Sequence, residues 1–342
     1  MDMPAAIACV IEGTDLSKNE MLDVMRLIMT GEATDAQIGG FLVGLRLKGE
    51  TVSEIVAAAT VMRELAIPVI VAQKNIVDTC GTGGSGSNKF NVSTASALVA
   101  AAAGAVIAKH GNRAASSKSG SADVLEAAGA EILLSPEQVG RCVDTVGVGF
   151  LFALSHHSAM KHAIGPRKEM TIRTIFNLLG PLTNPAGARR QVLGVYARQW
   201  LRPMAEVLQA LGSEHVMVVH SEDGLDEISI AAPTHVAELK DGEITEYQIE
   251  PGQFGLAVQA LDELLVEDAS ESLQLLNAAL SGEHEAAMDI VSLNAGAAIY
   301  VAGLCASLAA GVKMAQDAIG SGLAREKLRD FVDFTQQMKA LS

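Results

Sequence analysis

The sequence has few cysteines and few aromatic residues, and both shortages narrow the class of protein. Four cysteines are scattered over 342 residues without a C-x-x-C pair, at Cys9, Cys80, Cys142 and Cys305. This scatter is typical of reduced thiols, so we expect a cytoplasmic protein. Aromatic residues make up 4% of the chain, whereas 49% is hydrophobic with Ala, Gly and Leu dominant, a composition typical of an α/β protein.

Cations are also scarce, because 25 Lys and Arg residues face 40 Asp and Glu residues, which gives a net charge of −15. A general nucleic-acid-binding or anionic-membrane surface requires a positive field, so the composition predicts neither partner. The amino-terminal segment contains Asp2 and Glu12 and lacks the basic stretch of a secretory signal. The longest apolar run, Ala95–Ala108, is too short to span a bilayer. Any anion site must therefore be a local basic pocket on an acidic, soluble protein.

Residues 1–67 have the pattern of four short amphipathic helices. Three of them begin with capping-box spacing, in which a Ser or Thr caps the helix and a Glu or Gln three residues later reaches back. These caps are Ser17, Thr34 and Thr51; a further helix is expected over Pro4–Glu12, and Ile67-Pro68 ends the last one. Because short helices bury little alone, we expect them to pack on other segments or on a second subunit. The candidate packing face contains Ile38, Phe41, Leu42 and Leu45.

From about residue 74 the pattern changes to alternating strands and helices, which predicts a mostly parallel sheet with helices on both faces. Six strands are expected, over Asn75–Cys80, Ala105–Lys109, Glu131–Leu134, Val148–Ala153, Gln191–Ala197 and His215–His220. The turn Asp241-Gly242 joins two further strands, His235–Leu239 and Glu243–Ile249, into an antiparallel edge hairpin. Helices are expected over Ala95–Ala103, Ser270–Leu280, Asn294–Ala309 and Ala324–Met338.

These patterns predict the α/β class, with a small all-helical domain plus a larger domain that has a central, mostly parallel sheet flanked by helices. The helical domain is expected to span residues 1–72. The segment 158–188 includes a helical stretch, Ser158–Leu179, and we expect it to leave the sheet and pack on that domain. The α/β domain then comprises residues 73–157 and 189–342.

A glycine-rich segment lies between the first predicted strand and the helix that follows it. Its backbone can approach a ligand that a Cβ atom would hold away, and the N–H groups at the start of a helix attract anions. The glycines are Gly81, Gly83, Gly84 and Gly86. Short polar side chains, those of Asn91, Ser93 and Thr94, stand at the helix entrance. The segment therefore predicts a phosphate-binding loop.

Two named phosphate-binding motifs fit this segment less well. The Walker motif requires Lys and then Ser or Thr after its last glycine, but Ser87 and Asn88 follow Gly86. Gly81, Gly83 and Gly86 have the spacing of the dinucleotide-binding pattern G-x-G-x-x-G, but residues 88–91 separate these glycines from the helix. The next strand also ends in Lys109-His110, where a dinucleotide-binding protein has an acidic residue. For this loop taken alone, the alternative interpretation is a glycine-rich connection that binds no ligand.

A second loop, from Lys109 to Ser121, concentrates cations in an otherwise acidic chain. It contains Lys109, Arg113 and Lys118 together with four serines, after a strand and before a helix. Charge-assisted hydrogen bonds to phosphoryl oxygens are about twice as strong as neutral ones, so the loop is a candidate diphosphate site. A solvated basic loop is the alternative.

Two further clusters follow later strands. Asp226 and Glu227, in Asp223-Gly-Leu-Asp-Glu, are suited to Mg²⁺, which takes one or two carboxylates together with substrate oxygens; a surface pair is the alternative. His156 and His157 do not predict zinc, because adjacent histidines do not converge and no third ligand has suitable spacing. Arg167 is interpreted as a carboxylate-binding residue at the domain junction, with solvated helix charge as the alternative.

Six segments together resemble the anthranilate phosphoribosyltransferase family, in the family's order along most of the chain. They are Gly81–Gly84, Asn91–Thr94, Lys109–Arg113, Ser119–Asp123, Arg173–Pro185 and Asp223–Glu227. The resemblance implies a fold like that of nucleoside phosphorylases and phosphoribosyltransferases, and a homodimer joined through the amino-terminal helices. It implies a glycosyltransferase of tryptophan biosynthesis that moves the 5-phosphoribosyl group of phosphoribosyl diphosphate (PRPP) to the amine of anthranilate. The products would be N-(5-phosphoribosyl)anthranilate and diphosphate, and Mg²⁺ would be required.

The resemblance also implies roles for individual residues. PRPP would be bound by Gly81, Gly84, Ser85, Lys89, Asn91, Val92, Ser93, Thr94, Lys109, His110, Gly111, Asn112, Arg113, Ser116, Ser117 and Ser121. Anthranilate would contact Gly81, His110, Asn112, Arg167 and Pro181. Two Mg²⁺ ions would be held by Ser93, Asp226 and Glu227, and catalysis would depend on Lys109, Asp226 and Glu227.

The chain departs from the family pattern at three positions. Ser85 stands where the family usually has Asp, and Lys89 stands where small residues are common. Leu154 replaces a frequent Pro. The first change leaves open how the metal–PRPP complex is held on that side. Two other functions are also considered: a pyrimidine nucleoside phosphorylase-like enzyme, and a non-catalytic paralogue that binds nucleic acid, against which the net charge argues.

Overall fold

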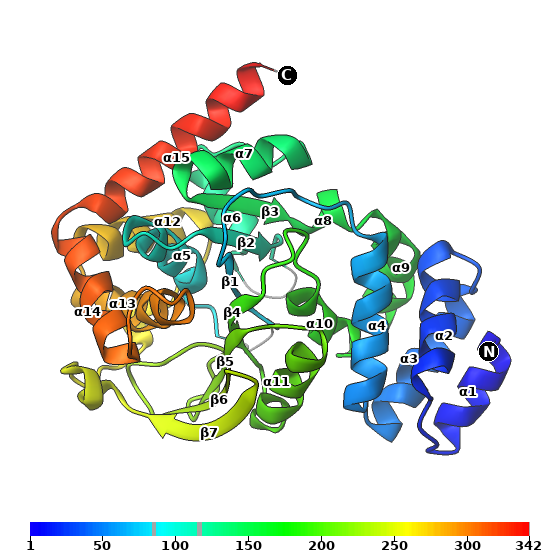
Figure 1. The fold of residues 1–342 in the computed structure, drawn as a ribbon. Coiled ribbons are helices and arrows are strands. Elements are labelled where there is room, and N and C mark those ends of the chain that lie inside the picture. Colours follow the sequence, from blue (N-terminus) through cyan, green and yellow to red (C-terminus); the bar gives the residue numbers. More distant parts are fainter. Residues whose placement is uncertain (84–86, 115–117, 342) are drawn as a thin grey trace.

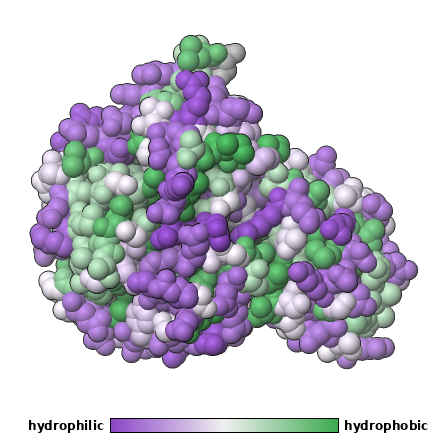
Figure 2. Space-filling model, in the orientation of Figure 1, coloured by the Kyte–Doolittle hydropathy of each residue, from purple (hydrophilic) through white to green (hydrophobic). Residues whose placement is uncertain are grey.

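The computed structural model describes residues 1–83, 87–114 and 118–341 of the chain. Figure 1 shows the amino-terminal helices beside a sheet that has helices on both faces. Figure 2, in the same orientation, shows hydrophilic and apolar residues interspersed over both parts. In the described ranges, no helix combines the length and the apolar character needed to cross a membrane.

The amino-terminal helices confirm the prediction from the sequence. They are α1 (Met3–Ile11), α2 (Lys18–Thr30), α3 (Asp35–Lys48) and α4 (Val52–Leu65). The three predicted capping boxes are formed at Ser17, Thr34 and Thr51. Gly31 ends α2 with a φ of 81°, a conformation that glycine adopts without strain.

The predicted packing face on α3 is used inside the chain. Its four side chains are at most 1% exposed and belong to a core shared with α2, α4 and the sheet; they are Ile38, Phe41, Leu42 and Leu45. This face packs on other segments of the same chain and is not available to a second subunit. The exposed apolar side chains of these helices are different ones, since Ile11 is 70% and Leu47 is 82% exposed.

The sheet has seven strands in the order β3-β2-β1-β4-β5-β6-β7. The strands are β1 (Val77–Gly81), β2 (Ile107–Gly111), β3 (Val148–Phe152), β4 (Arg190–Gly194), β5 (His215–Ser221), β6 (Thr234–Lys240) and β7 (Glu243–Ile249). The first five pair in parallel, and β6 and β7 form the predicted antiparallel edge hairpin. Because the carboxyl ends of parallel strands meet at one edge, the loops after β1, β2 and β5 can converge there.

Alternate residues of β5 face two different cores. In β5, Met217 and Val219 belong to the core around α5 (Val92–Ala102) and α13 (Glu285–Val301), whereas Val216 and Val218 belong to the core that includes the amino-terminal helices. The second core runs without a break from α1 to the sheet. The predicted division near residue 72 therefore stays a prediction.

The remaining helices lie around the sheet or between it and the amino-terminal helices. They are α6 (Ser121–Ala127), α7 (Pro136–Val146), α8 (Ala153–His156), α9 (Lys161–Met170), α10 (Phe176–Leu179), α11 (Leu201–Ala210), α12 (Ala269–Ser281), α14 (Leu308–Gly320) and α15 (Leu323–Ala340). The predicted helical stretch between residues 158 and 179 is interrupted, because Thr171 adopts a φ of 52° and ends α9. α9 packs against α2 and α3.

Two predictions of secondary structure are wrong. Glu131–Leu134 forms no strand; the Glu131 N–H donates to the Thr335 hydroxyl, and the Leu133 N–H to the Glu131 carboxylate, so side chains take the place of a neighbouring strand. The helix expected over Asn294–Ala309 is two helices, α13 and α14. Gly303, with a φ of 80°, lies in the break, and the Ser307 side chain caps α14.

Candidate active site

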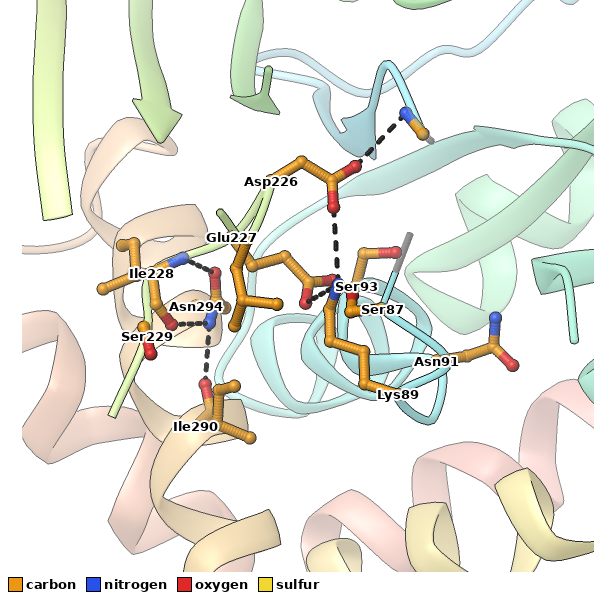
Figure 3. A network of polar contacts seen from close by, with 12 residues as sticks. Ser87, Lys89, Asn91, Ser93, Asp226, Glu227, Ile228, Ser229, Ile290 and Asn294 are labelled. Carbon is orange, nitrogen blue, oxygen red and sulfur yellow. Dashed lines mark hydrogen bonds and ion pairs between the residues drawn. The ribbon is translucent and has the colours of Figure 1, made fainter. Parts of the chain in front are cut away.

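Two adjacent carboxylates, Asp226 and Glu227, lie in the loop that follows β5 at the carboxyl edge of the sheet. We call them the acidic pair. Oδ1 of Asp226 and Oε2 of Glu227 each lie 3.3 Å from Nζ of Lys89, which also donates to the Ser87 hydroxyl at 3.1 Å. The N–H of Gly83 donates to the other carboxylate oxygen of Asp226 at 3.2 Å. The acidic pair therefore contacts the glycine-rich segment, as Figure 3 shows for Lys89 and Asp226.

The acidic pair reaches this position because two strand ends are glycine. A Cβ on Gly194 would lie 1.6 Å from the carbonyl oxygen of Asp226, and a Cβ on Gly81 would lie 2.6 Å from its Oδ2. Asn294 of α13 accepts a hydrogen bond from the Ile228 N–H and donates to the Ile228 carbonyl, each at 2.9 Å. Gly194 and Asn294 could not be identified as positioning residues from the sequence, because no local motif relates them to the acidic loop.

Lys109 on β2 is a second buried cation at the same edge. It is 3% exposed, and its Nζ donates to the Thr79 carbonyl at 2.5 Å and to the Ser93 hydroxyl at 3.1 Å. Burial lowers the pKa of Lys109, and the negative charge of Asp78 opposes this effect. Ser93 and Glu227 line one small cavity. Lys109, Ser93 and Glu227 thus lie close enough to share one ligand.

The electrostatics of the acidic pair are unusual. Burial raises the pKa of Glu227 to about 7; the charge of Asp226 adds to this shift and Lys89 opposes it. For Lys89, burial disfavours the ammonium, but the two carboxylates outweigh burial and raise its pKa. Oε2 of Glu227 is buried and accepts no hydrogen bond from the described residues.

The donor set fits a magnesium ion that is completed by its substrate. No group of three or more His, Cys, Asp or Glu residues with metal-binding geometry occurs among the residues that the structure describes. Mg²⁺ does not require one, since it typically takes one or two carboxylates, keeps several waters and binds substrate phosphates. Asp226, Glu227 and the Ser93 hydroxyl lining the cavity supply such a partial set.

Asn91 connects the glycine-rich segment to two other elements. Its Oδ1 accepts hydrogen bonds from the hydroxyls of Ser119 and Ser272, each at 2.7 Å, and its Nδ2 donates to the Ser119 carbonyl at 3.2 Å. The side chain therefore positions the second loop and α12 and does not cap α5. Val92 and Thr94 at the start of α5 are buried, and the N–H of Val92 donates to the Phe90 carbonyl at 2.7 Å.

Two of the three cations of the second loop are neutralised by acidic residues of the protein, so the loop contributes less positive charge to the site than its composition predicts. Nη2 of Arg113 donates to Oε1 of Glu126 at 2.8 Å, and Nζ of Lys118 lies 3.0 Å from Oε2 of Glu267. These two cations are paired with acids of the protein, whereas the third cation of the loop points into the site. Sequence position alone could not reveal these pairings, because Lys118 and Glu267 are far apart in the chain.

The residues around the end of β2 form a compact turn. A Cβ on Gly111 would lie 2.3 Å from the Ser121 hydroxyl oxygen, and that hydroxyl donates to the Asn112 carbonyl at 3.2 Å. Oδ1 of Asn112 accepts from the Arg113 N–H at 2.8 Å. Four other predicted PRPP-binding residues lie outside the described residues: Gly84, Ser85, Ser116 and Ser117.

His110 lies against the segment that follows α10. Its Nδ1 is 3.2 Å from the Gly180 carbonyl oxygen, and its ring centroid is 5.1 Å from that of His157. Burial, together with the nearby His157, lowers the pKa of His110 to about 3, so the imidazole is neutral near pH 7. Because Nδ1 faces a carbonyl it must donate, which leaves Nε2 as an acceptor; Nε2 has no partner in the described part of the chain.

Arg167 of α9 is close to the same segment. It is half-buried, its guanidinium lies 5.2 Å from the ring centroid of Phe176, and burial lowers its pKa. It forms no ion pair with the residues that the structure describes. The carbonyl of Pro181 accepts from Nε2 of Gln191 at 2.8 Å. Phe176, Gly180 and Pro181 belong to one short segment, which therefore brings together three of the five predicted anthranilate-binding residues, His110, Arg167 and Pro181.

Comparisons with known proteins cover both parts of the chain. Residues 4–66 match a family described as "Glycosyl transferase family, helical bundle domain", and residues 73–325 match "Glycosyl transferase family, a/b domain". Anthranilate phosphoribosyltransferases from Marinomonas sp. (strain MWYL1) and Thioalkalivibrio sulfidiphilus are each 63% identical to the chain; the matches cover 98% of this chain, and 98% and 99% of those proteins.

Solved structures give the same result. The crystal structure of anthranilate phosphoribosyltransferase from Thermus thermophilus is similar with a TM-score of 0.91 and 44% identity, covering 97% of this chain and 99% of that one. The enzyme from Saccharomyces cerevisiae in complex with PRPP and Mg is similar with a TM-score of 0.89 and 26% identity, covering 98% of each chain.

Proposed function

The chain belongs to the anthranilate phosphoribosyltransferase family of glycosyltransferases, and from that premise we propose how its residues divide the reaction. The enzyme transfers the 5-phosphoribosyl group of PRPP to the amine of anthranilate, in tryptophan biosynthesis. The predicted family, fold class and activity are confirmed. The comparisons support neither the nucleoside phosphorylase nor the nucleic-acid-binding alternative.

Displacing diphosphate from the anomeric carbon builds positive charge on the ribose and negative charge on the leaving group. We assign stabilisation of the leaving group to Lys109 and to the positive end of the α5 helix dipole, which favours anions. Lys109 suits this role because its Nζ is held by Thr79 and Ser93, so its charge is positioned before the substrate arrives. No Ser/His/Asp or Cys/His arrangement is required, because the amine itself attacks the sugar.

Asp226, Glu227 and Ser93 are proposed to hold Mg²⁺, two ions per site, together with the oxygens of PRPP. The relative from Saccharomyces cerevisiae that was solved in complex with PRPP and Mg supports the choice of metal. When bound, Mg²⁺ would supply positive charge that stabilises the diphosphate leaving group. The protein's part is to aim two carboxylates at one cavity, which the close approach of Gly194 to the Asp226 backbone makes possible.

Arg167 and His110 are proposed to position anthranilate. The planar guanidinium of Arg167 can bind a carboxylate with two hydrogen bonds, and this arginine has no carboxylate partner in the described residues. His110 offers its Nε2 as an acceptor for the substrate amine. Since the pKa of His110 is lowered to about 3, it is a weak base, and we assign it a positioning role.

The meeting of Lys109, Ser93 and the acidic pair at one sheet edge is the observation that carries these assignments. The direct test combines the protein with PRPP, Mg²⁺ and anthranilate and follows the loss of anthranilate fluorescence. We expect the signal to fall only when all three are present. A matched reaction with inorganic phosphate and a pyrimidine nucleoside tests the phosphorylase alternative; nucleoside cleavage without anthranilate consumption would contradict the proposal.

We also propose that the protein is a cytoplasmic homodimer joined through its amino-terminal helices. α1 and α3 pack together, and each leaves a large apolar side chain exposed, Ile11 on α1 and Leu47 on α3. Light scattering should give twice the monomer mass for the native chain. The double variant Ile11→Glu with Leu47→Glu should give the monomer mass; a dimer of unchanged stability would contradict the proposed surface.

A further inference from the structure

Lys89 occupies the space between the two carboxylates to which the metal is assigned. Its Nζ lies 3.3 Å from Oδ1 of Asp226 and 3.3 Å from Oε2 of Glu227, and the three side chains are only 10%, 10% and 13% exposed. The hydroxyl of Ser87, 3.1 Å away, accepts a further hydrogen bond. Figure 3 shows the Lys89 side chain directed at this group of oxygens.

The backbone around Lys89 holds it in place. The N–H of Phe90 donates to the Leu264 carbonyl at 2.9 Å, and the N–H of Val266 donates to the Asn88 carbonyl at 2.7 Å. Phe90 itself is 1% exposed. The loop is therefore fixed on both sides of Lys89, while the ammonium stands at the end of a flexible four-carbon chain. The backbone of Lys89 is thus anchored beside the acidic pair, while rotation about its side-chain bonds can move the ammonium away from the carboxylates.

One ammonium and one Mg²⁺ cannot use the same two carboxylate oxygens at once. Mg²⁺ binds oxygen at about 2.1 Å and demands near-octahedral geometry, which a second cation between the same oxygens would block by volume and by charge. The ammonium also satisfies part of the negative charge that would otherwise attract the metal.

We propose that Lys89 is an internal competitor of Mg²⁺: it closes the acidic pair in the metal-free protein, and the metal binds by displacing it. This inference rests on the proposed function, since it takes Asp226 and Glu227 as metal ligands. Its consequence is that the protein alone has a weaker affinity for Mg²⁺ than its two carboxylates could provide. Lys89 is a positioning residue, because it acts through the acidic pair.

Calorimetric titration with Mg²⁺ alone, without substrates, tests the competition. Removing the ammonium with Lys89→Met should tighten Mg²⁺ binding about tenfold, which corresponds to about 1.4 kcal/mol. Lys89→Arg keeps the charge and should bind Mg²⁺ as weakly as the native chain. Lys313→Met is the matched control, because it removes an exposed lysine that pairs with Asp317 on α14, and its affinity should equal the native value.

A second readout separates competition from a purely structural role. In chelator, Lys89→Met should melt at a lower temperature than the native chain, because the acidic pair has lost its counter-ion. Saturating Mg²⁺ should raise the melting temperature of Lys89→Met more than that of the native chain. Adding Glu227→Gln to Lys89→Met should remove the gain in affinity, which locates the competition at the acidic pair.

The inference is overturned if Lys89→Met binds Mg²⁺ no more tightly than the native chain, whether or not its melting temperature falls. Lys89→Thr serves the same comparison if the methionine variant does not fold. The two proposals can fail separately: tighter binding by Lys89→Met without consumption of anthranilate would overturn the transferase assignment alone. Consumption of anthranilate with unchanged affinity would overturn the competition alone.

Discussion

Two buried lysine–carboxylate clusters, one in the helical part and one at the sheet edge, differ in how completely their oxygens are satisfied. In the first, Nζ of Lys48 lies 2.6 Å from Oδ1 of Asp15 and 3.0 Å from Oε2 of Glu54. The fully buried Glu54 also accepts hydrogen bonds from the Leu16 N–H, the Thr51 N–H and the Thr51 hydroxyl. Both oxygens of Glu54 thus have protein partners, so this cluster joins α3 and α4 and has no capacity for a ligand.

The cluster of Lys89 with the acidic pair is looser and incomplete. Both ion-pair distances are 3.3 Å, and Oε2 of Glu227 accepts no hydrogen bond from the described residues. Two carboxylates share one ammonium there, so a single ammonium faces both of them when both are ionised. Incomplete satisfaction of buried carboxylates costs stability, and it persists where function requires the unused oxygens. The comparison predicts that one cluster controls activity and the other controls stability.

The largest effect should follow from neutralising the acidic pair. The double variant Asp226→Asn with Glu227→Gln should lower kcat/KM about 10³-fold or more, because it removes the charges that hold the metal. Its thermal stability should change far less than its activity, because relief of the repulsion between two like charges opposes the loss of the carboxylate partners of Lys89. Steady-state kinetics and a melting curve on the same preparation check both statements; metal-dependent turnover at the native rate would contradict the site.

The matching change in the helical part should reverse this pattern. Glu54→Gln should lower the free energy of unfolding by about 3 kcal/mol, because Lys48 loses its buried partner. Activity per folded molecule should be unchanged, since the cluster does not contact the site. Urea unfolding followed by kinetics at a permissive temperature measures both. A large loss of kcat with native stability would show that the helical cluster is more than structural.

Much of the fold could be predicted from the sequence, because helix caps and turns depend on neighbouring residues. The capping boxes at Ser17, Thr34 and Thr51 and the hairpin turn Asp241-Gly242 depend on residues a few positions apart. The wrong strand prediction could not be avoided from local sequence. Glu131–Leu134 has the composition of a strand, but its backbone N–H groups donate to the distant Thr335 and to the Glu131 carboxylate.

The candidate site divides in the same way. The residue types at the sheet edge could be predicted, since loops after parallel strands converge, but their pairing could not. In the sequence, Arg113, Lys118 and Lys109 are three similar cations of one loop. Only the fold shows that Arg113 pairs with Glu126 and Lys118 with Glu267, whereas Lys109 donates to Ser93. The position of Lys89 between two carboxylates likewise depends on a loop more than a hundred residues away.

Replacing Arg167, which has no acid partner among the described residues, should have a smaller and more selective effect. Arg167→Lys should raise the KM for anthranilate about 30-fold while the KM for PRPP changes little, because a lysine cannot reproduce the planar fork that binds a carboxylate. Arg202→Lys, which changes an exposed arginine paired with Glu206 and Glu246, is the matched control and should leave both KM values unchanged. Equal increases for both substrates would count against the assignment.

The smallest effect concerns a side chain that the fold keeps uncharged. Burial, with His157 nearby, lowers the pKa of His110 to about 3, whereas an unfolded histidine titrates near about 6.5. Between these values the unfolded chain binds the extra proton, so stability is fully present above about pH 6.5 and is lost as the pH falls toward 3, by at most about 1.4 kcal/mol per pH unit.

Urea unfolding of the native chain at pH 7.5, 6.5 and 5.5 should show this decline. His110→Gln should decline less steeply, though not become flat, because burial also lowers the pKa of His157, to about 4. An identical decline in both proteins would mean that His110 is not held neutral, and the acceptor role assigned to its Nε2 would then be lost.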